Sequence, residues 1–304
     1  MEVFNNIKEM IGKTPILKIS KFDLKDGVNI YAKLENFNPG GSVKDRIGDY
    51  MIKQAEKRGK LKKGYTIVEA TAGNTGLGIA LGALNRGYRV VFAVPEKFSI
   101  EKQVLMRALG AEIVHTPEKD GMRGAIEKAK ELLNKIPNSI SLGQFENEDN
   151  PQTHYLTTGP EIYEQLNGKI DYFVAGAGSG GTFTGIAKYL KEKNSNVKAV
   201  LADPEGSTLG GGTEEHGYAI EGIGNDFLPD TMDLKLVDKV IKVNDEEAFS
   251  LVKELAKREG LIVGSSSGAA IAAALKIART IDKGNIVTVF PDRGDRYFSK
   301  NLYE

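Results

Sequence analysis

Residues 38–46 read Asn-Pro-Gly-Gly-Ser-Val-Lys-Asp-Arg, and this stretch organises the interpretation of the whole chain. Its first four residues have the composition of a turn, because proline fixes one φ angle and the two glycines allow backbone that a Cβ would forbid. Ser42 then offers a hydroxyl that can cap a helix by accepting from an amide two or three residues later. The stretch therefore predicts a tight turn followed by a helix start.

Lys44 is the residue of chemical interest in this stretch. The spacing of Ile47, Met51 and Ile52 predicts an amphipathic helix over 45–58, with Lys44 in its first turn. The helix dipole disfavours an ammonium at that end. A lysine whose neutral amine is favoured is a candidate for Schiff-base chemistry. A solvated surface lysine is the alternative, and the remaining motifs must decide between them.

Composition limits the class of protein. The 304 residues are enough for about two domains. Lys+Arg and Asp+Glu both number 41, so no net field attracts nucleic acid or an anionic membrane. There is no cysteine, and His115, His154 and His216 lack ligand spacing, so we expect no metal site. No apolar run resembles a signal peptide or a membrane span, and we expect a cytoplasmic protein.

Short β-branched runs alternate with helical patterns along the chain. Strands are expected at 29–34, 66–68, 90–94, 112–114, 172–174, 197–202, 240–243 and 286–290. Helices are expected over 45–58, 76–85, 99–109, 120–135, 161–166, 181–193, 245–258 and 267–281. This alternation indicates crossover units and parallel sheets, so the fold class is α/β. In such sheets ligands bind where strands end and helices begin.

Four loops at predicted strand ends are candidate binding segments. Residues 69–76 read E-A-T-A-G-N-T-G and offer hydroxyls and helix N-terminal amides to a carboxylate. Residues 176–182 read G-A-G-S-G-G-T and suit a phosphate, because successive amides face it with no side chains in the way. Residues 144–147 and 264–270 (G-S-S-S-G-A-A) are weaker signals on their own.

The glycine-rich loop also fits a second kind of enzyme. Gly176, Gly178 and Gly181 match G-x-G-x-x-G, and Asp203 follows about twenty residues later at the end of the next predicted strand. This is the dinucleotide-binding fingerprint. A nicotinamide or flavin oxidoreductase is therefore a rival interpretation of this segment alone.

Taken together and in order, these segments resemble the cysteine synthase and cystathionine β-synthase family, fold-type-II enzymes that use pyridoxal phosphate. The resemblance covers essentially the whole chain. It rests on seven motifs, at 11–15 (I-G-K-T-P), 38–46, 69–76, 178–182, 203–207 (D-P-E-G-S), 221–224 (E-G-I-G) and 264–270. The dinucleotide interpretation accounts for only one of them.

The resemblance implies a tryptophan synthase β-like α/β fold. Two three-layer αβα domains with twisted, mostly parallel sheets are expected. Residues 1–42 plus 146–304 would form a large cofactor-binding domain, and 43–145 a small, mobile substrate domain. Homodimers are usual in the family.

The resemblance also assigns roles by position. Lys44 would hold the cofactor as an internal aldimine and later take the α-proton. Asn74 would bind the pyridine 3′-oxygen, and Ser266 would face the pyridine nitrogen. The phosphate would be bound by Gly178, Ser179, Gly180, Gly181 and Thr182. The substrate carboxylate would be surrounded by Thr71, Ala72, Thr75 and Gln144.

The activity implied is β-replacement on a serine-like amino acid (O-acetylserine, serine or cysteine) with a sulfur nucleophile, through an aminoacrylate intermediate. An alternative within the fold releases hydrogen sulfide from L-cysteine and gives lanthionine or serine. A serine or threonine dehydratase is disfavoured, because those enzymes usually carry S-F-K where this chain has S-V-K at 42–44. A regulatory partner without catalysis is disfavoured because every cofactor position holds a competent residue.

The substrate loop departs from the family's common E-P-T-S-G-N-T-G at two positions. Ala70 replaces the proline and Ala72 the serine. The hydroxyl lost at Ala72 removes a donor near the leaving group or the carboxylate, so the choice of substrate does not carry over. Asp292 stands where the family places a residue near the pyridine serine, with no role assigned. The chain resembles the short bacterial branch of the family.

Overall fold

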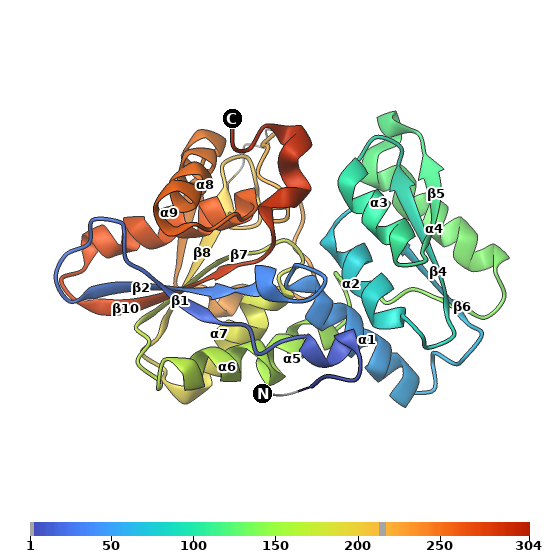
Figure 1. The fold of residues 1–304 in the computed structure, drawn as a ribbon, viewed down its shortest axis with the longest axis horizontal. Helices are drawn as coiled ribbons and strands as arrows, with labels where there is room; N and C mark the ends of the chain where they lie inside the picture. Colours follow the sequence, from blue (N-terminus) through green and yellow to red (C-terminus); the bar gives the residue numbers. More distant parts are fainter. Residues whose placement is uncertain (1–2, 213–216) are drawn as a thin grey trace. The chain divides into compact units, whose positions relative to one another are not determined.

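A computed structural model describes residues 3–212 and 217–304 of the chain, so His216 lies outside the described residues. Two compact units make up the structure (Figure 1). The smaller unit consists of Asn38–Asp149 and the segment that ends at Ile11. The larger unit consists of Gly12–Phe37 and Asn150–Glu304. Each unit is built around its own sheet.

The larger unit contains a six-stranded sheet in the order β1-β2-β10-β7-β8-β9. The bounds are β1 Ile16–Ile19, β2 Val28–Leu34, β7 Tyr172–Gly176, β8 Lys198–Pro204, β9 Lys239–Val243 and β10 Gly284–Phe290. Strand β1 pairs antiparallel with β2, and the other neighbouring pairs are parallel. The carboxyl ends of the parallel strands thus share one edge, where ligand-binding loops are expected.

Helices cover both faces of this sheet, as Figure 1 shows. The bounds are α5 Asp149–Leu156, α6 Thr158–Gln165, α7 Gly181–Lys193, α8 Asp245–Glu259 and α9 Ser265–Thr280. Alternate residues of β7 point to opposite faces: Phe173 packs with the core under α6 and α7, and Val174 packs with the core under α8 and α9. Short 3-10 helices are η2 Glu35–Phe37, η4 Leu234–Leu236 and η5 Gly294–Lys300.

The smaller unit has a four-stranded, fully parallel sheet in the order β5-β4-β3-β6. Its strands are β3 Thr66–Ala70, β4 Arg89–Pro95, β5 Glu112–Thr116 and β6 Ser139–Ile140. Its helices are α1 Lys44–Lys57, α2 Asn74–Ala83, α3 Ile100–Ala108 and α4 Gly121–Lys135, with 3-10 helices η1 Ile7–Met10 and η3 Glu118–Asp120. Phe92 of β4 packs with the core of α1, α2 and α3, whereas Val91 packs against α4. Both units are therefore three-layer αβα sandwiches, which confirms the predicted fold class.

Helices α1 and α2 approach each other through glycine. A Cβ at Gly82 would lie 3.0 Å from the backbone of Asp49, and a Cβ at Gly48 or Gly78 would overlap the backbone of the other helix. At Gly78 the overlapping atom is the carbonyl oxygen of Lys44. Glycine at these positions therefore brings the start of α1 directly against α2.

The predicted strands and helices all have counterparts in the structure. Apart from the two-residue β6 and the 3-10 helices, two elements, β1 and α5, lack a prediction. Strand β1 is only four residues long and follows Pro15 at the sheet edge. Helix α5 reads D-N-P-Q-T-H-Y-L, which has little apolar periodicity and carries Pro151 in its first turn, where proline is tolerated. Weak local signals explain both omissions.

The segment that ends at Ile11 belongs to the smaller unit, where Lys8 Nζ donates to the Leu84 carbonyl at 2.8 Å. The sequence interpretation assigned it to the other domain. The functional labels of the two domains, cofactor binding and mobile substrate binding, remain predictions.

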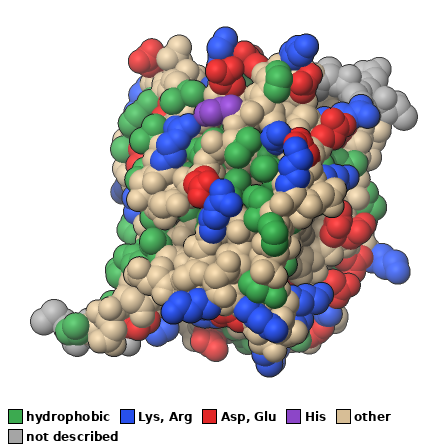
Figure 2. Space-filling view, turned by 90° about the vertical axis from the view of Figure 1, so that its right-hand side faces the viewer, with side chains coloured by type: hydrophobic (Ala, Val, Ile, Leu, Met, Phe, Trp, Pro, Cys, Tyr) green, Lys and Arg blue, Asp and Glu red, His purple; other side chains and the backbone are tan. Residues whose placement is uncertain are grey.

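The surface carries charges of both signs. Figure 2 shows Lys and Arg side chains interspersed with Asp and Glu on one face of the molecule. This mixture agrees with the equal numbers of basic and acidic residues. Over residues 3–212 and 217–304, none of the helices has both the length and the apolar character needed to cross a bilayer.

Candidate active site

Lys44 is the first residue of α1, in the smaller unit. Its backbone N–H donates to the Ser42 hydroxyl at 3.3 Å. The Ser42 hydroxyl thus accepts from an amide two residues later, as predicted, although the N-cap residue of α1 is Val43, with φ −55° and ψ −22°. The Asp45 and Arg46 amides bond back to the carbonyls of Ser42 and Val43 at 3.2 and 3.3 Å. A tight turn therefore leads into the helix at the predicted place.

Asp45 stabilises the turn that precedes the lysine. Its buried carboxylate accepts from the Gly40 N–H at 2.6 Å. A Cβ at Gly40 would lie 2.5 Å from the Asp45 Oδ1 atom, so glycine is required for this contact. The turn composition read from the sequence thus has a defined structural purpose, which is to hold the backbone that presents Lys44.

The substrate loop is ordered around the Thr71 hydroxyl. This oxygen accepts from the Gly73 and Gly76 amides at 3.4 and 3.2 Å. Its own proton is therefore directed elsewhere and can be donated to an anion. Asn74 is the first residue of α2 and is half-buried, and Ala72 is 4% exposed.

Gln144 joins this loop from a distant part of the chain. The Thr75 hydroxyl donates to Gln144 Oε1 at 2.6 Å. The Gln144 side-chain carbonyl is thus oriented by Thr75, which also sets the direction of the amide nitrogen. The structure brings three predicted carboxylate-binding residues, Thr71, Thr75 and Gln144, into one hydrogen-bonded region of the smaller unit.

Glu69, which sequence reasoning passed over, lies beside this region. Its Oε1 atom accepts from the Ser141 hydroxyl at 2.9 Å, the Leu142 N–H and the Gly143 N–H at 2.9 Å. Burial raises the pKa of the Glu69 carboxyl, while these three donors oppose the shift. The available signal was an acidic residue directly after the apolar strand predicted at 66–68. Carboxylates are almost never buried without partners, so such a residue indicates a polar contact.

The glycine-rich loop of the larger unit connects β7 to α7. Gly180 is the N-cap of α7, with a φ of 83° that favours glycine, and Gly181 and Thr182 form the first turn. A Cβ at Gly178 would lie 2.5 Å from the Gly222 carbonyl oxygen, and a Cβ at Gly181 would overlap the Asn150 side chain. The loop is therefore a backbone cradle at a helix N-terminus, which favours an anion.

Polar side chains from other elements hold this cradle. Asn150 Nδ2 donates to the Ser179 hydroxyl at 2.9 Å, the Asn225 side chain donates to the Gly178 carbonyl, and the Thr231 hydroxyl donates to the Ser179 carbonyl. None of the three was predicted. Asn225 directly follows the 221–224 motif, so its position was a usable signal, whereas Asn150 and Thr231 carry none in the sequence.

His154 also supports the glycine-rich loop. It is fully buried, and its Nε2 atom lies 3.1 Å from the Thr182 hydroxyl while its Nδ1 atom lies 2.8 Å from the Thr158 hydroxyl. Because a neutral imidazole has one donor and one acceptor, these contacts fix the orientation of Thr182.

Ser266 is the second residue of α9 and is 4% exposed. It therefore lies inside the first helical turn and not in the preceding loop, contrary to the predicted helix start at residue 267. Ser265, next to it, accepts from the Glu221 N–H at 3.0 Å. Within residues 3–212 and 217–304, no hydrogen bond is recorded for the Ser266 hydroxyl, which leaves it for a ligand.

The 221–224 segment links the two parts of the larger unit's site. Glu221 contacts the start of α9 through Ser265, and the Gly224 N–H donates to the Ala177 carbonyl at 2.8 Å. The glycine-rich loop and the Ser266 turn are thus braced by one segment, which gives this motif a structural role.

Asp292 lies beside the start of α9. Tyr297 donates its hydroxyl to Asp292 Oδ2 at 2.5 Å, and the Gly264 N–H donates to the Asp292 carbonyl at 3.2 Å. Burial, followed by the nearby Asp292, raises the pKa of Tyr297 well above its ordinary value, so the phenol keeps its proton. Asp292 thus supports the turn that carries Ser266.

Asp203 is engaged in a way that does not suit a ribose. It is fully buried, pairs with Lys242 Nζ at 2.6 Å and accepts from the Gly210 N–H at 3.0 Å, all through Oδ2. Lys242 lies on the neighbouring strand β9. The acidic residue of the dinucleotide fingerprint is therefore part of an internal ion pair.

Among the described residues, no cluster of three or more His, Asp or Glu side chains could hold a metal ion.

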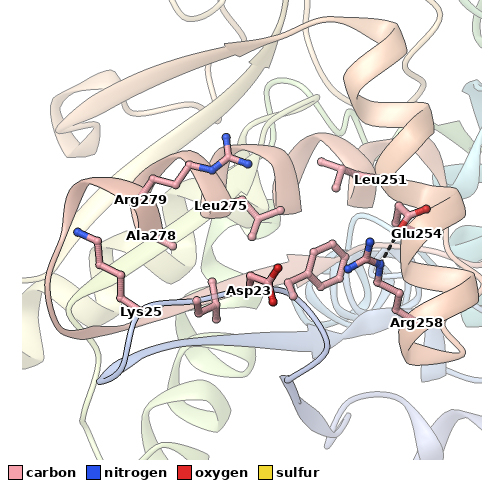
Figure 3. A pocket seen from close by; sticks show the side chains of 10 residues that line it. Asp23, Lys25, Leu251, Glu254, Arg258, Leu275, Ala278 and Arg279 are labelled. Carbon is pink, nitrogen blue, oxygen red and sulfur yellow. Dashed lines mark hydrogen bonds and ion pairs between the residues drawn. The ribbon is translucent and has the colours of Figure 1, made fainter.

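A cavity of about 420 Å³ lies in the larger unit between the β1–β2 loop, α8 and α9 (Figure 3). Its lining includes Asp23, Glu254, Arg258 and Arg279, and none of the predicted site residues.

The residues fit pyridoxal phosphate. A lysine amine at a helix start, an anion cradle that a Cβ would fill, and a buried serine hydroxyl that bonds to none of the described residues are the groups that this cofactor requires. Fold and site together define an α/β enzyme that depends on a phosphorylated cofactor.

Comparison with known proteins identifies the family. The family described as "Pyridoxal-phosphate dependent enzyme" matches residues 7–292, and the chain belongs to it. This membership confirms the predicted cofactor and excludes the dinucleotide interpretation.

Three known proteins illustrate the similarity. The chain is 56% identical to an O-acetylserine dependent cystathionine beta-synthase of Bacillus subtilis, over 100% of this chain and 99% of the relative. It is 49% identical to a cysteine synthase of Helicobacter pylori, over 99% of each protein. A crystal structure of a hydrogen sulfide-producing enzyme from Fusobacterium nucleatum is 40% identical, with a TM-score of 0.93 over 97% of this chain and 100% of that chain.

Proposed function

We propose that this protein catalyses β-replacement on a serine-like amino acid with a sulfur nucleophile, as cysteine synthases and cystathionine β-synthases do. The observation that carries the proposal is the combination of Lys44 at the start of α1 with a substrate loop whose donors suit an amino-acid carboxylate. The similarity to the Bacillus subtilis enzyme, named for its dependence on O-acetylserine, supports that donor first.

Lys44 is the proposed catalytic residue. Its amine would hold the cofactor covalently and, after displacement by the substrate amine, its Nζ would accept the α-proton. Bound pyridoxal phosphate supplies an electron sink for the carbanion that this proton transfer creates. The tight turn at Ser42 and the close contact of α1 with α2 support the role, because both restrict where the lysine backbone lies.

Binding of the cofactor is assigned to the residues that the family resemblance names. Gly178, Ser179, Gly180, Gly181 and Thr182 would donate to the phosphate, and Asn74 to the 3′-oxygen. Ser266 would face the pyridine nitrogen. A serine hydroxyl does not hold that nitrogen protonated as a carboxylate would, which suits rapid loss of a β-leaving group over transamination.

The amino-acid carboxylate is assigned to the smaller unit. The Thr71 proton and the Gln144 amide are the donors proposed to bind it. The Thr75 hydroxyl donates to Gln144 and is therefore a positioning group in this proposal. Ala72 would complete the pocket without the hydroxyl that most of the family has.

A second activity is favoured by one observation. The Fusobacterium nucleatum structure is named a hydrogen sulfide-producing enzyme and shares 40% of its sequence with this chain. Release of sulfide from L-cysteine, giving lanthionine or serine, is therefore the alternative to synthesis of cysteine or cystathionine.

Spectroscopy and product analysis test the proposal together. The visible spectrum of the purified protein is recorded, then O-acetylserine, serine and cysteine are added separately, each with sulfide or homocysteine as acceptor. We expect a visible cofactor band that O-acetylserine changes fastest, with cystathionine or cysteine as product. Sulfide from cysteine alone would identify the alternative. A colourless protein that takes up no added pyridoxal phosphate would refute both.

We also propose that the protein is a cytoplasmic homodimer, as the family resemblance implies. Light scattering during size-exclusion chromatography measures the mass directly. A mass of one chain would contradict the dimer.

A further inference from the structure

We propose that Glu69 is a positioning residue, which holds the loop of Gln144 in place and thereby sets the affinity for the amino-acid substrate. The inference rests on the proposed function, because it takes Gln144 as a carboxylate donor. No role was assigned to Glu69, although it is buried and lies two residues before Thr71, the nearest predicted substrate residue.

The sheet register explains why a carboxylate stands at this position. Strands β3 and β6 run parallel and pair only at Thr66 with Ser139 and at Ile67 with Ile140. Continuing that register by two residues places Glu69 beside Leu142. At this point the ladder has ended, and the Leu142 and Gly143 amides donate to Glu69 Oε1 in its place. The side chain thus satisfies amides that a longer strand would have paired.

The same loop is fixed on its other side. Gly143 has a φ of 65°, and its carbonyl accepts from the Glu146 and Asn147 amides at 3.1 and 2.9 Å. The Asn147 side chain donates to the Leu142 carbonyl at 2.7 Å. Glu69 and Asn147 therefore hold opposite sides of residues 142 and 143, and Gln144 follows immediately.

The Gln144 side chain completes the connection to the substrate loop. It accepts from Thr75 at 2.6 Å, and Thr75 lies in the first turn of α2. Both ends of the 69–76 segment therefore contact the 141–144 segment, one through Glu69 and the other through Thr75. Displacement of the loop backbone at Gly143 would move Gln144 relative to Thr71 and weaken carboxylate binding.

Three substitutions separate the shape of Glu69 from its charge. Glu69→Gln keeps Oε1 and all three of its donors, because an amide carbonyl also accepts. Glu69→Asp shortens the side chain by one methylene, so its oxygens no longer reach residues 141–143, and Glu69→Ala removes them. We expect Glu69→Asp and Glu69→Ala to raise KM for the amino-acid donor about tenfold with a smaller change in kcat. Glu69→Gln should stay within about twofold of the unaltered enzyme.

A double-mutant cycle with Gln144→Ala tests the route of the effect. If Glu69 acts through Gln144, Glu69→Asp should change KM by less than about twofold once Gln144→Ala is present. A merely structural role would leave its effect undiminished in that background. Equal effects of Glu69→Asp in the two backgrounds, or loss of function in Glu69→Gln as large as in Glu69→Ala, would overturn the proposal.

Hydrogen exchange provides a measurement independent of activity. In the purified protein without substrate, the Leu142 and Gly143 amides should exchange at least about tenfold faster in Glu69→Asp and at nearly the unaltered rate in Glu69→Gln. Glu56→Gln is the matched control, since Glu56 accepts from Tyr88 and Arg86 at 2.6 and 2.8 Å in the same unit. It should leave residues 141–144 and KM unchanged.

The outcomes separate this inference from the proposed function. An unaltered protein that binds no cofactor and forms no product would refute the proposed function, whatever the exchange data show. An active protein whose KM and whose 142–143 exchange are both insensitive to Glu69→Asp would refute the positioning role alone.

Discussion

The 69–76 loop of the smaller unit and the glycine-rich 176–182 loop of the larger unit are held by different means. Around residues 69–76 and 141–144, side chains make the contacts: Glu69 accepts from two backbone amides, and Thr75 donates to Gln144. Around 176–182, the loop can form only because glycine has no side chain: a Cβ at Gly178 or Gly181 would enter occupied space. Polar groups such as Asn150 then hold the glycine-rich loop in place through hydrogen bonds.

Because of this difference, we expect the two loops to respond differently to mutation. A hydrogen bond between side chains can be weakened or replaced by a similar group, so losses at the substrate loop should be graded. A glycine in contact with neighbouring atoms cannot accept a Cβ without displacing them, so losses at the phosphate loop should be abrupt.

Lys44→Ala removes the only group in the proposal that holds the cofactor covalently and moves the α-proton. Turnover should fall by at least about 10²-fold, the lower range for loss of an acid–base group. The visible band should change to that of non-covalently bound cofactor. Circular dichroism should be unaltered, because alanine suits the first turn of α1. Substantial turnover in this variant would remove Lys44 from the mechanism.

Gly181→Ala should lower the affinity for pyridoxal phosphate by at least about tenfold, because its Cβ would overlap Asn150 and overpacking costs about 1–3 kcal/mol. Titration of cofactor-free protein measures the dissociation constant. Gly217→Ala is the control, since none of the described residues beyond its chain neighbours lies within 4 Å of a Cβ built there. Equal affinities for the two variants would mean that the glycine cradle does not bind the cofactor.

Thr75→Val deletes the hydroxyl that orients Gln144 while keeping the shape of the side chain. KM for the amino-acid donor should rise about fivefold, as expected for one hydrogen bond, with cofactor affinity unchanged. Thr75→Ser keeps the hydroxyl and should restore most of the affinity. Steady-state kinetics separate the two variants, and failure of the serine to restore KM would show that the threonine methyl group matters instead.

Glu69→Gln should change the pH dependence of stability. Burial raises the pKa of the Glu69 carboxyl above its ordinary value of 4.5, so the folded protein binds more protons than the unfolded chain between the two pKa values. The free energy of unfolding of the unaltered protein should therefore decrease as pH rises through the raised pKa. Below the pKa that Glu69 has in the unfolded chain, this destabilisation should be absent.

Glutamine does not titrate, so the variant lacks this component. Urea denaturation of both proteins at about pH 5 and pH 8 should show the variant gaining stability relative to the unaltered protein at the higher pH. A constant difference between the two proteins would indicate that Glu69 titrates alike in both states.

Much of the site could be recognised before the fold was known. Glycine, proline and small polar residues have strong local conformational preferences. Local composition therefore predicts the turn before Lys44 and the loop at 176–182. The start of α7 at Gly181 agrees with its predicted start. Ser266 was proposed as a site residue from its motif but was expected before the helix, because three successive serines suggested a cap that Gly264 provides instead.

Local sequence signals were sufficient to predict the alternation of strands and helices, the position of Lys44 and the two loops, because each depends on residues within a few positions of one another. The distant groups that complete these features depend on the tertiary fold. Glu69 meets Gly143 across 74 positions, Asn150 meets Ser179 across 29, and Asp203 meets Lys242 across 39. No local preference encodes such pairs, since burial and strand order bring them together, and both follow from packing the whole chain.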